Sequence, residues 1–198
     1  PFLRVRMRAE LKRLQQNLGI SFIHVTHSQE EAMALSDLVV VMNEGRIEQA
    51  GSAREVFSRP RTPFVARFIG GHNVVEGRAE TVSDGIVHAA IAPGGHVAAR
   101  APKPVAAGEP VAIAVRADQI VLNPPADAAA DGNSLKGTIA SIQYQGSFVE
   151  VRVEAGQSEP ILVTVPDNAF DAAPLKEGED ATLTWPIEEG HLLVGAGA

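Results

Sequence analysis

The chain has 198 residues, of which 45% are hydrophobic and 21% charged, so it can bury a core and is not disordered by composition. Seventeen Lys and Arg against 24 Asp and Glu give a formal net charge of −7, which argues against general affinity for nucleic acid or anionic membranes. The absence of cysteine excludes disulfides, thiolate zinc sites and cysteine nucleophiles. No apolar run is long enough to span a bilayer, and the arginine-rich start does not read as a signal peptide.

The charge balance and the pattern of hydrophobic and turn residues both change near Gly70-Gly71. Residues 1–70 carry 10 basic and 7 acidic side chains, whereas residues 71–198 carry 7 and 17. The first part has helical periodicity with a few short strands, and the second alternates between short β-like runs and turn residues. We therefore predict a domain boundary at this Gly-Gly pair. Because the sequence begins at Pro1 rather than at Met, we also expect it to be a piece of a longer protein.

Residues 1–70 have the pattern of an α/β segment. Met7, Leu11, Leu14 and Leu18 recur at helical spacing and predict an amphipathic helix that ends at Gly19. Three further helices are predicted, each opened by a hydroxyl N-cap, at residues 28–35, 52–59 and 62–69. Short strands are predicted at residues 20–25, 38–42 and 46–50.

Residues 71–198 are predicted to be all-β. Val149, Val151 and Val153 alternate with charged residues, which is typical of a strand with one buried and one exposed face. Similar runs predict strands at residues 111–115, 161–165 and 181–185. Short strands at this spacing favour a small barrel or sandwich, with Trp185 in its core. We see no internal repeat in the residues, although two related β-subdomains are an alternative.

His27 is the candidate functional residue of the first part. It follows the predicted strand at 20–25 and precedes the helix that Ser28 caps. In a parallel α/β sheet, ligands bind at that edge, and a helix N-terminus favours anions such as phosphate. An imidazole there can donate a hydrogen bond to a phosphate oxygen or orient a water. The alternative is a histidine that only satisfies the turn.

Five stretches of the first part follow one another in the order and spacing of a known family. They are residues 3–11, 25–27 with 29–32, 41–47, 49–51 and 64–70. On these stretches, residues 1–70 resemble the C-terminal part of the ATP-binding subunit of an ABC-type importer. The nearest branch serves maltose-type sugars, polyamines and ferric iron. The resemblance implies that His27 is the switch histidine, which contacts the γ-phosphate of ATP when two subunits close on each other.

The sequence departs from a complete ATPase of this kind. Ser28 stands where the family usually has Asp, although Ser still caps a helix well. There is no P-loop, no Gly-rich signature and no strand that ends in paired Asp-Glu. We therefore expect this chain alone not to hydrolyse ATP and to bind no cofactor, while the resemblance implies ATP and magnesium in the full-length parent. His24 and His27 have no third ligand near in sequence, so no metal site is expected.

The second part resembles, more loosely, the TOBE domain that follows the ATPase in such subunits, an OB-like barrel. The matching residues are 114–120, which lie at a family Arg-Pro-Glu turn, and the closing stretches 183–185 and 191–194. Arg116 fits that turn, but Ala117 and Asp118 depart from it, so no role is carried over. The acidic balance argues against an oxyanion site and against single-stranded nucleic acid. The remaining histidines, His72, His88, His96 and His191, are expected to be solvated.

These observations together predict an α/β fragment, the tail of an ABC ATPase domain at residues 1–70, followed by an all-β OB-like TOBE domain at residues 71–198. The resemblance implies a homodimer through both domains, membrane-spanning permease partners, no nucleic acid, and a peripheral place on the cytoplasmic face of the plasma membrane. Its parent would couple ATP hydrolysis to solute uptake. Two alternatives are open: a stand-alone β module that senses a small ligand or dimerises, and an acidic OB-like scaffold for a protein partner.

Overall fold

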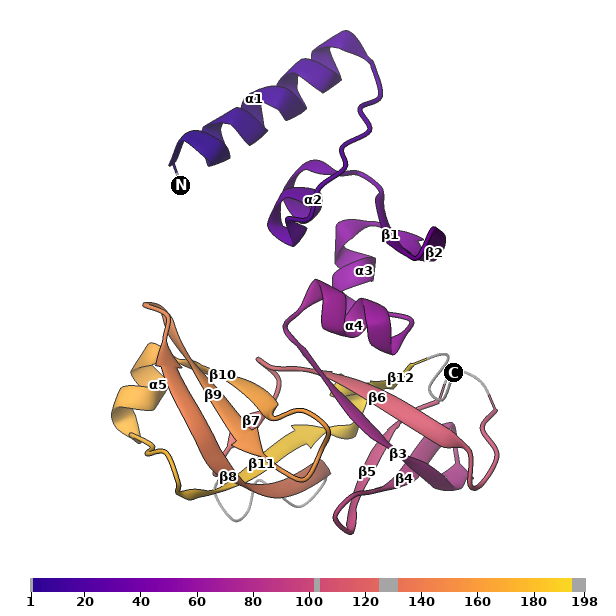
Figure 1. The fold of residues 1–198 in the computed structure, drawn as a ribbon, viewed down its shortest axis with the longest axis vertical. Helices are drawn as coiled ribbons and strands as arrows, with labels where there is room; N and C mark the ends of the chain where they lie inside the picture. The colour runs from indigo at the N-terminus through magenta and orange to yellow at the C-terminus, as the bar shows by residue number, and fades with distance from the viewer. Residues whose placement is uncertain (1, 102–103, 125–131, 194–198) are drawn as a thin grey trace. The chain divides into compact units, whose positions relative to one another are not determined.

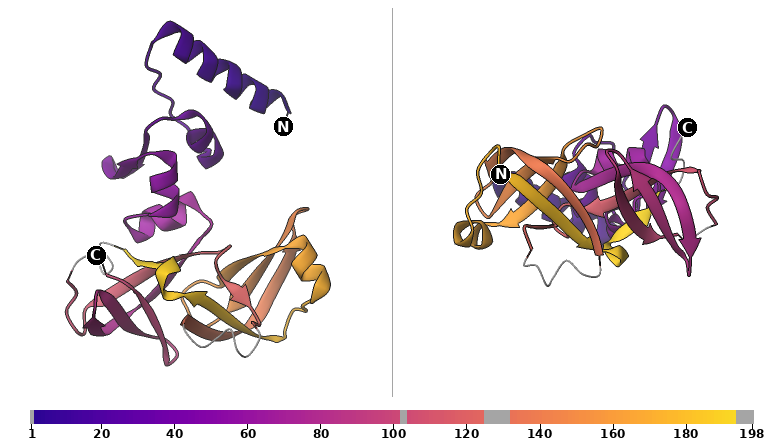
Figure 2. Two further views of the ribbon diagram at one scale, coloured as in Figure 1. Left: turned by 180° about the vertical axis from the view of Figure 1, so that it is seen from behind. Right: turned by 90° about the horizontal axis from the view of Figure 1, so that it is seen from below.

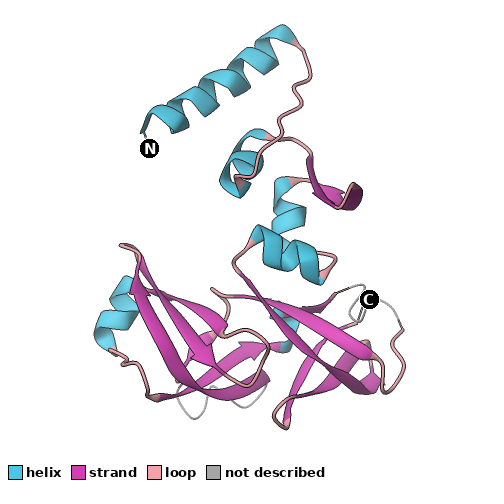
Figure 3. Ribbon diagram, in the orientation of Figure 1, coloured by secondary structure: helices cyan, strands magenta, loops and turns pink. Residues whose placement is uncertain are grey.

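The computed structural model describes residues 2–101, 104–124 and 132–193, and its contacts form two compact units, residues 1–61 and residues 62–198. Unit 1 is mainly helical with one β-hairpin, and unit 2 is mainly strand (Figure 3). The mixed α/β part followed by OB-like β structure confirms the expected fold class. The contact division lies at Arg61, before Gly70, because the helix at residues 63–69 packs within unit 2. The assignment of residues 1–70 and 71–198 to two family domains stays a prediction.

The helices of unit 1 begin and end at the capping residues that the sequence contains (Figure 1). Gly19, with φ of +63°, follows the first helix in the left-handed conformation that glycine tolerates best. Ser52 and Glu55 form a complete capping box, and the hydrogen bonds from Ser52 to its carboxylate lower the pKa of Glu55. The elements are α1 (Phe2–Leu18), α2 (Gln29–Leu35), β1 (Val39–Asn43), β2 (Arg46–Gly51) and α3 (Ala53–Ser58).

The strand predicted at residues 20–25 is wrong. These residues form neither strand nor helix, and the side chains of Ile23 and Val25 are 95% and 90% exposed. A buried strand needs neighbours that pair its backbone N–H and C=O groups. In the described part of unit 1, β1 and β2 pair only with each other. The apolar segment therefore has no partner strand among the described residues.

Unit 2 opens with a helix that lies on strands of the unit. Thr62 caps it, Pro63 occupies its first turn, and Ala66 packs with Ala112, Ala114 and Leu193. The elements of unit 2 are α4 (Pro63–Ile69), β3 (His72–Ser83), β4 (Ile86–Ile91), β5 (Gly95–Arg100), β6 (Pro110–Arg116), β7 (Val121–Leu122), β8 (Gly132–Tyr144), β9 (Phe148–Glu154), β10 (Ile161–Pro166), α5 (Asp167–Ala172), β11 (Asp180–Pro186), a 3-10 turn (Ile187–Glu189) and β12 (Gly190–Leu192).

The β-strands of unit 2 form two sheets of the same design (Figures 1 and 2). One is a closed barrel in the order β12-β5-β4-β3-β6, and the other has the order β10-β9-β8-β11-β7. In each, four consecutive strands pair in the same order, β3 to β6 in one and β8 to β11 in the other. The fifth strand is exchanged: β7 follows β6 in sequence but pairs with β11, and β12 follows β11 but pairs with β6.

Two buried asparagines join the two sheets. The Asn73 side chain donates to the carbonyl of Leu162 (2.8 Å) and accepts from its N–H (2.7 Å). Asn133 does the same with Ala98, at 2.9 Å and 2.6 Å. Each amide thus takes the place of a neighbouring strand residue and satisfies a backbone pair that would otherwise be left unbonded.

β3 and β8, each the first of the four consecutive strands in its sheet, carry Asn and Gly at equivalent positions. Gly77 and Gly137 lie four residues after the two asparagines, and each strand shifts register next to Ala79 or Ile139. The structure therefore supports the alternative of two related β-subdomains. Over residues 73–79 and 133–139, Asn and Gly are the only shared residues, which explains why the sequence hides the repeat.

One core runs through both sheets of unit 2. It contains large side chains that are almost fully buried, among them Ile113, Ile139 and Leu183. Trp185 is 2% exposed and belongs to this core, as predicted. The position of the residue 191–194 stretch is confirmed only to Leu193, since Val194 lies outside the described residues.

Candidate functional site around His27

His27 lies in a bend between the irregular segment at 20–26 and the first turn of α2, and its side chain is exposed. Ser28 is the N-cap of α2, and its hydroxyl accepts the N–H of Glu31 at 3.3 Å. The predicted helix start is therefore confirmed, although the strand expected before it is absent. An exposed imidazole can donate a hydrogen bond to an anion or exchange a proton with water. The arrangement leaves both capacities available.

A ring of hydrogen bonds closes around this bend. The hydroxyl of Thr26 accepts the N–H of Ser28 at 2.9 Å and donates to Glu31 Oε2 at 3.0 Å. His24 Nε2 lies 3.6 Å from the same carboxylate oxygen, which makes an ion pair when His24 is protonated. Sequence reasoning missed the hydrogen bond between Thr26 and Glu31. The available signal was a Thr two residues before the N-cap, because Thr hydroxyls often bond the backbone two positions on.

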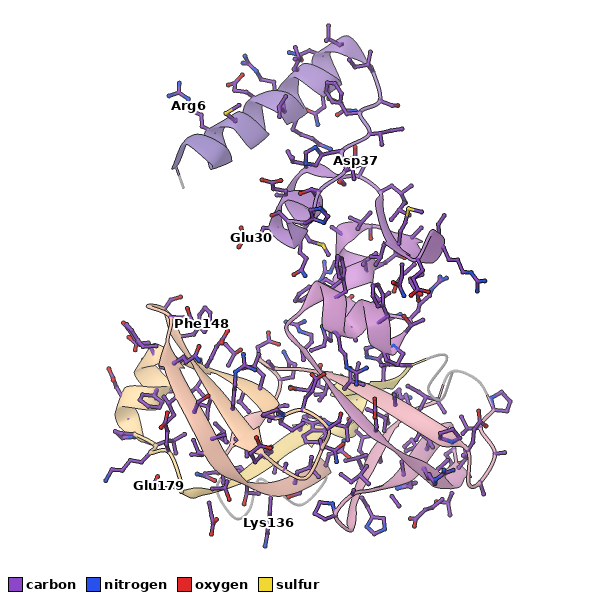
Figure 4. The ribbon with its side chains drawn as sticks, in the orientation of Figure 1. Arg6, Glu30, Asp37, Lys136, Phe148 and Glu179 are labelled. Carbon is purple, nitrogen blue, oxygen red and sulfur yellow. The ribbon has the colours of Figure 1, made fainter. Side chains whose placement is uncertain are left out.

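The far end of α2 is also held by a charged group. Lys12 Nζ of α1 donates to the carbonyl of Leu35 at 3.2 Å and to Asp37 Oδ1 at 2.6 Å (Figure 4). A cation at a helix C-terminus is favourable because the last carbonyls there lack partners in the helix. Both ends of α2 are therefore fixed by side chains outside the helix.

Unit 1 exposes most of the large apolar side chains that lie at the surface of the described residues. Twelve of sixteen such side chains belong to residues 1–61. They are Met7, Leu11, Leu14, Leu18, Ile20, Phe22, Ile23, Val25, Leu38, Val40, Met42 and Ile47. Surface apolar residues that lie singly are ordinary, but a concentration of this kind indicates a surface that another part of a protein covers.

Within the described residues, no group of three or more His, Asp or Glu side chains is placed to hold a metal ion. The described helices also include none that is long and apolar enough to cross a membrane.

His72, expected to be solvated, is instead half-buried where β3 begins. Its Nδ1 donates to the carbonyl of Gly70 at 3.1 Å. Burial lowers the pKa of His72, and His191 and Arg116 lower it further, while the bond to Gly70 and the carboxylate of Asp118 act in the opposite direction. Arg116 and Asp118 form an ion pair, with Arg116 Nε donating to Asp118 Oδ1 at 2.9 Å. The Asp that departs from the family turn thus binds the Arg that matches it.

The lowered pKa of His72 predicts a loss of stability in mild acid. Below the ordinary histidine pKa of 6.5, the unfolded chain binds a proton at His72 more readily than the folded chain does, so the free energy of unfolding falls as the pH drops. We expect His72→Gln to lose less stability than wild type between about pH 7.5 and 5.5, measured by urea unfolding. His88→Gln, an exposed change on β4, should follow the wild-type curve. The prediction would be contradicted if the free energy of unfolding changed with pH equally in wild type and in His72→Gln.

Part of unit 2 matches a known protein family. The family model described as the TOBE domain matches residues 113–193, from β6 to the end of β12. This stretch includes the Arg116–Asp118 turn and the closing strands on which the sequence resemblance depends.

Two relatives cover nearly the whole chain. The spermidine/putrescine import ATP-binding protein PotA of Thermobifida fusca is 36% identical over 98% of this chain and 50% of its own length. The uncharacterized ABC transporter ATP-binding protein YdcT of Escherichia coli is 37% identical over 92% of this chain and 47% of its own length. The resemblance to ABC importer ATP-binding proteins is confirmed. The chain spans about half the length of both relatives.

A solved structure supports the fold of unit 2. The cytoplasmic molybdate-binding protein ModG, with molybdate bound, aligns with a TM-score of 0.55 and 24% identity, covering 62% of this chain and 95% of that one. At this identity the likeness concerns the fold alone. The ABC importer resemblance therefore rests on the sequence matches, and the ModG likeness adds the architecture of the β unit.

Proposed function

We propose that this chain is the C-terminal part of the ATP-binding subunit of an ABC importer, in which it supplies the switch histidine and the regulatory β domain. The observation that carries the proposal is the 36% identity with an import ATP-binding protein over 98% of the chain. In the full-length subunit, ATP hydrolysis would drive solute uptake. Residues 1–70 would then be the end of the ATPase domain and residues 71–198 the TOBE-type domain.

The surface of unit 1 supports this proposal. Apolar side chains cover one stripe of α1 and the irregular segment at 20–25, where Ile23 and Val25 are almost fully exposed. Burial of apolar surface stabilises a fold by about 25 cal/mol per Å² removed from water. A larger ATPase domain would bury this surface and would provide the neighbouring strands that residues 20–25 need to enter a sheet.

The chain's own part in the ATP site would be small. The exposed imidazole of His27 suits one phosphate oxygen, because it presents a ring N–H in a bend fixed on both sides. ATP with magnesium supplies the phosphoryl group whose transfer such a subunit accelerates. This sequence contains no P-loop and no strand that ends in paired Asp-Glu, so those groups would come from the other part of the subunit.

The partners and place of the full-length protein follow from the same proposal. It would pair with a second copy through both domains and dock on membrane-spanning permease subunits at the cytoplasmic face of the membrane. Spermidine and putrescine are the solutes named for one group of relatives, so polyamines are the first solutes to test.

A substitution at His27 tests the proposal in the full-length protein that contains this chain. We expect His27→Ala to lower the rate of phosphate release from ATP with magnesium by about 100-fold or more, because one positioned proton-transfer or hydrogen-bonding group is removed. His88→Ala, also an exposed histidine, should keep the wild-type rate. The 198-residue chain alone should release no phosphate above background.

Two results would contradict the proposal. A full-length His27→Ala variant that retains the wild-type rate would reject the role of this histidine. A full-length protein that hydrolyses no ATP, while unit 2 is stabilised against heat by a small ligand, would favour the stand-alone sensor instead.

A further inference from the structure

We propose that Thr26 and Glu31 are positioning residues that hold the bend carrying His27 in the conformation that exposes its imidazole. The inference rests on the proposed function, because it deepens the role of the same histidine. Neither residue carries the chemistry itself. They act on His27 through the backbone that connects Thr26 to Ser28.

The hydroxyl of Thr26 is used in two directions. It accepts the N–H of Ser28 at 2.9 Å, which spans the residue between them, His27. It also donates to the Glu31 carboxylate at 3.0 Å. A hydroxyl has one proton to donate and two lone pairs, so both bonds form at once. The bond to an ionised carboxylate is of the stronger, charge-assisted kind.

Glu31 completes the ring from the helix side. Its backbone N–H donates to the Ser28 hydroxyl at 3.3 Å while its carboxylate accepts from Thr26. The residues on both sides of His27 are therefore tied to one residue of α2. Its carboxylate side chain is 27% exposed, so water screens the Thr26 bond only in part.

The Thr26 bonds lie outside the helix and are not needed to cap it. Ser28 caps α2 through its own hydroxyl, and the N–H of Ala32 bonds the Ser28 carbonyl at 3.1 Å. Removal of the Thr26 hydroxyl would leave both of these contacts in place. Its expected effect is a wider range of backbone conformations at His27, with α2 intact.

The first test uses the full-length protein and three variants. Thr26→Val keeps the shape but removes both hydrogen bonds. We expect kcat for ATP hydrolysis to fall about tenfold or more, since the loss of one hydrogen bond alone can account for about tenfold, with little change in KM. Thr26→Ser restores the hydroxyl and should restore kcat. Glu31→Gln keeps an acceptor without the charge and should give an intermediate rate. Glu30→Gln is the matched control, since Glu30 is the adjacent carboxylate of α2 and is exposed (Figure 4).

A second measurement uses the 198-residue chain and does not need ATP. Amide hydrogen exchange at Ser28 should be about tenfold faster in Thr26→Val than in wild type, because the N–H loses its acceptor. Exchange at Ala32 should not change, since that N–H bonds the Ser28 carbonyl. A general loosening of α2 would raise both rates and would contradict a role confined to the bend.

The outcomes separate the inference from the proposed function. If His27→Ala is inactive but Thr26→Val has the wild-type kcat, the inference is overturned and the proposed function stands. If His27→Ala retains full activity, the role proposed for this histidine fails, and the Ser28 exchange rate still decides whether Thr26 fixes the bend. A Thr26→Val variant that unfolds is replaced by Glu31→Gln, for which an unchanged kcat and an unchanged Ser28 exchange rate would overturn the inference.

Discussion

Replacing Asn133 by aspartate will lower the free energy of unfolding of this chain by about 3 kcal/mol or more at neutral pH. The aspartate keeps an acceptor for the N–H of Ala98 but loses the donor that bonds the Ala98 carbonyl at 2.9 Å. It also puts a negative charge beside that carbonyl oxygen at a position only 4% exposed. A buried charge without a donor is among the most destabilising changes known in proteins.

Urea unfolding measures this loss of stability, followed by the fluorescence of Trp185, which lies in the core of unit 2. Asn123→Asp is the matched control. Asn123 is exposed, and its Oδ1 accepts the N–H of Thr182 at 2.8 Å, a bond that aspartate retains. We expect that control to change stability by less than about 0.5 kcal/mol. Equal stability of the two variants would show that the Asn133 amide does not join the sheets.

The difference should shrink in acid. Near about pH 4 an aspartate begins to be protonated, and the acid form has an O–H that can donate to the Ala98 carbonyl again. Asn73→Asp, the equivalent change on β3, should behave in the same way, because Asn73 bonds the N–H and the carbonyl of Leu162.

A single added methyl group at Gly137 is expected to destabilise the chain by about 3 kcal/mol. A Cβ there would overlap the backbone carbonyl oxygen of Glu154 on β9 and lie 2.7 Å from Val153 Cγ1. Backbone atoms cannot turn away as a flexible side chain can, so β8 and β9 would have to separate. Gly77→Ala should be similar, since its Cβ would overlap the Ala90 carbonyl and lie 2.8 Å from Ile91 Cγ2.

Thermal unfolding of Gly137→Ala and of Lys136→Ala separates close packing from a general effect of alanine in this strand. Lys136 is the adjacent residue, and its side chain projects away from the sheet (Figure 4). We expect Lys136→Ala to lie within about 0.5 kcal/mol of wild type. If the two variants melt together, the close approach of β8 and β9 at Gly137 does not limit the side chain.

Capping and turn residues correctly predicted the helix starts and the hairpin of the first part. Ser28, Ser52 and Thr62 each cap the helix that the sequence assigned to them. The two strands of the hairpin, at residues 38–42 and 46–50, were also predicted, and between them Glu44 and Gly45 adopt the positive φ values, 47° and 76°, that a tight hairpin turn requires. These features depend on a few neighbouring residues, so one sequence is enough to find them.

Features that depend on distant partners were missed or wrong. Residues 20–25 have the composition of a buried strand but no strand in the described chain pairs with them. The long strands β3 and β8 were not predicted, because Gly77 and Gly137 look like turn residues when they instead allow a neighbouring strand to approach closely. His72 was expected in solvent. No residue near it in sequence indicates that β3 begins at His72 or that the side chain there is partly buried.

The candidate site was predicted in part. Sequence reasoning and the family resemblance singled out His27, and the structure places it, exposed, directly before the Ser28 cap. Thr26 and Glu31 were not singled out, because their contact with each other depends on how the bend folds back onto α2. A motif identifies the side chain that meets a ligand more readily than the groups that orient it.

The exchange of β7 and β12 makes the halves of unit 2 inseparable. A chain cut after Leu122 would leave the first half without the strand that closes its barrel against β5 and β6, and the second half without the strand that covers the edge of β11. Neither fragment would have a complete sheet, so each would expose a ready template for aggregation. A split reporter built at this point should regain signal only when both pieces are mixed, which makes unit 2 a natural candidate for a fragment-complementation sensor.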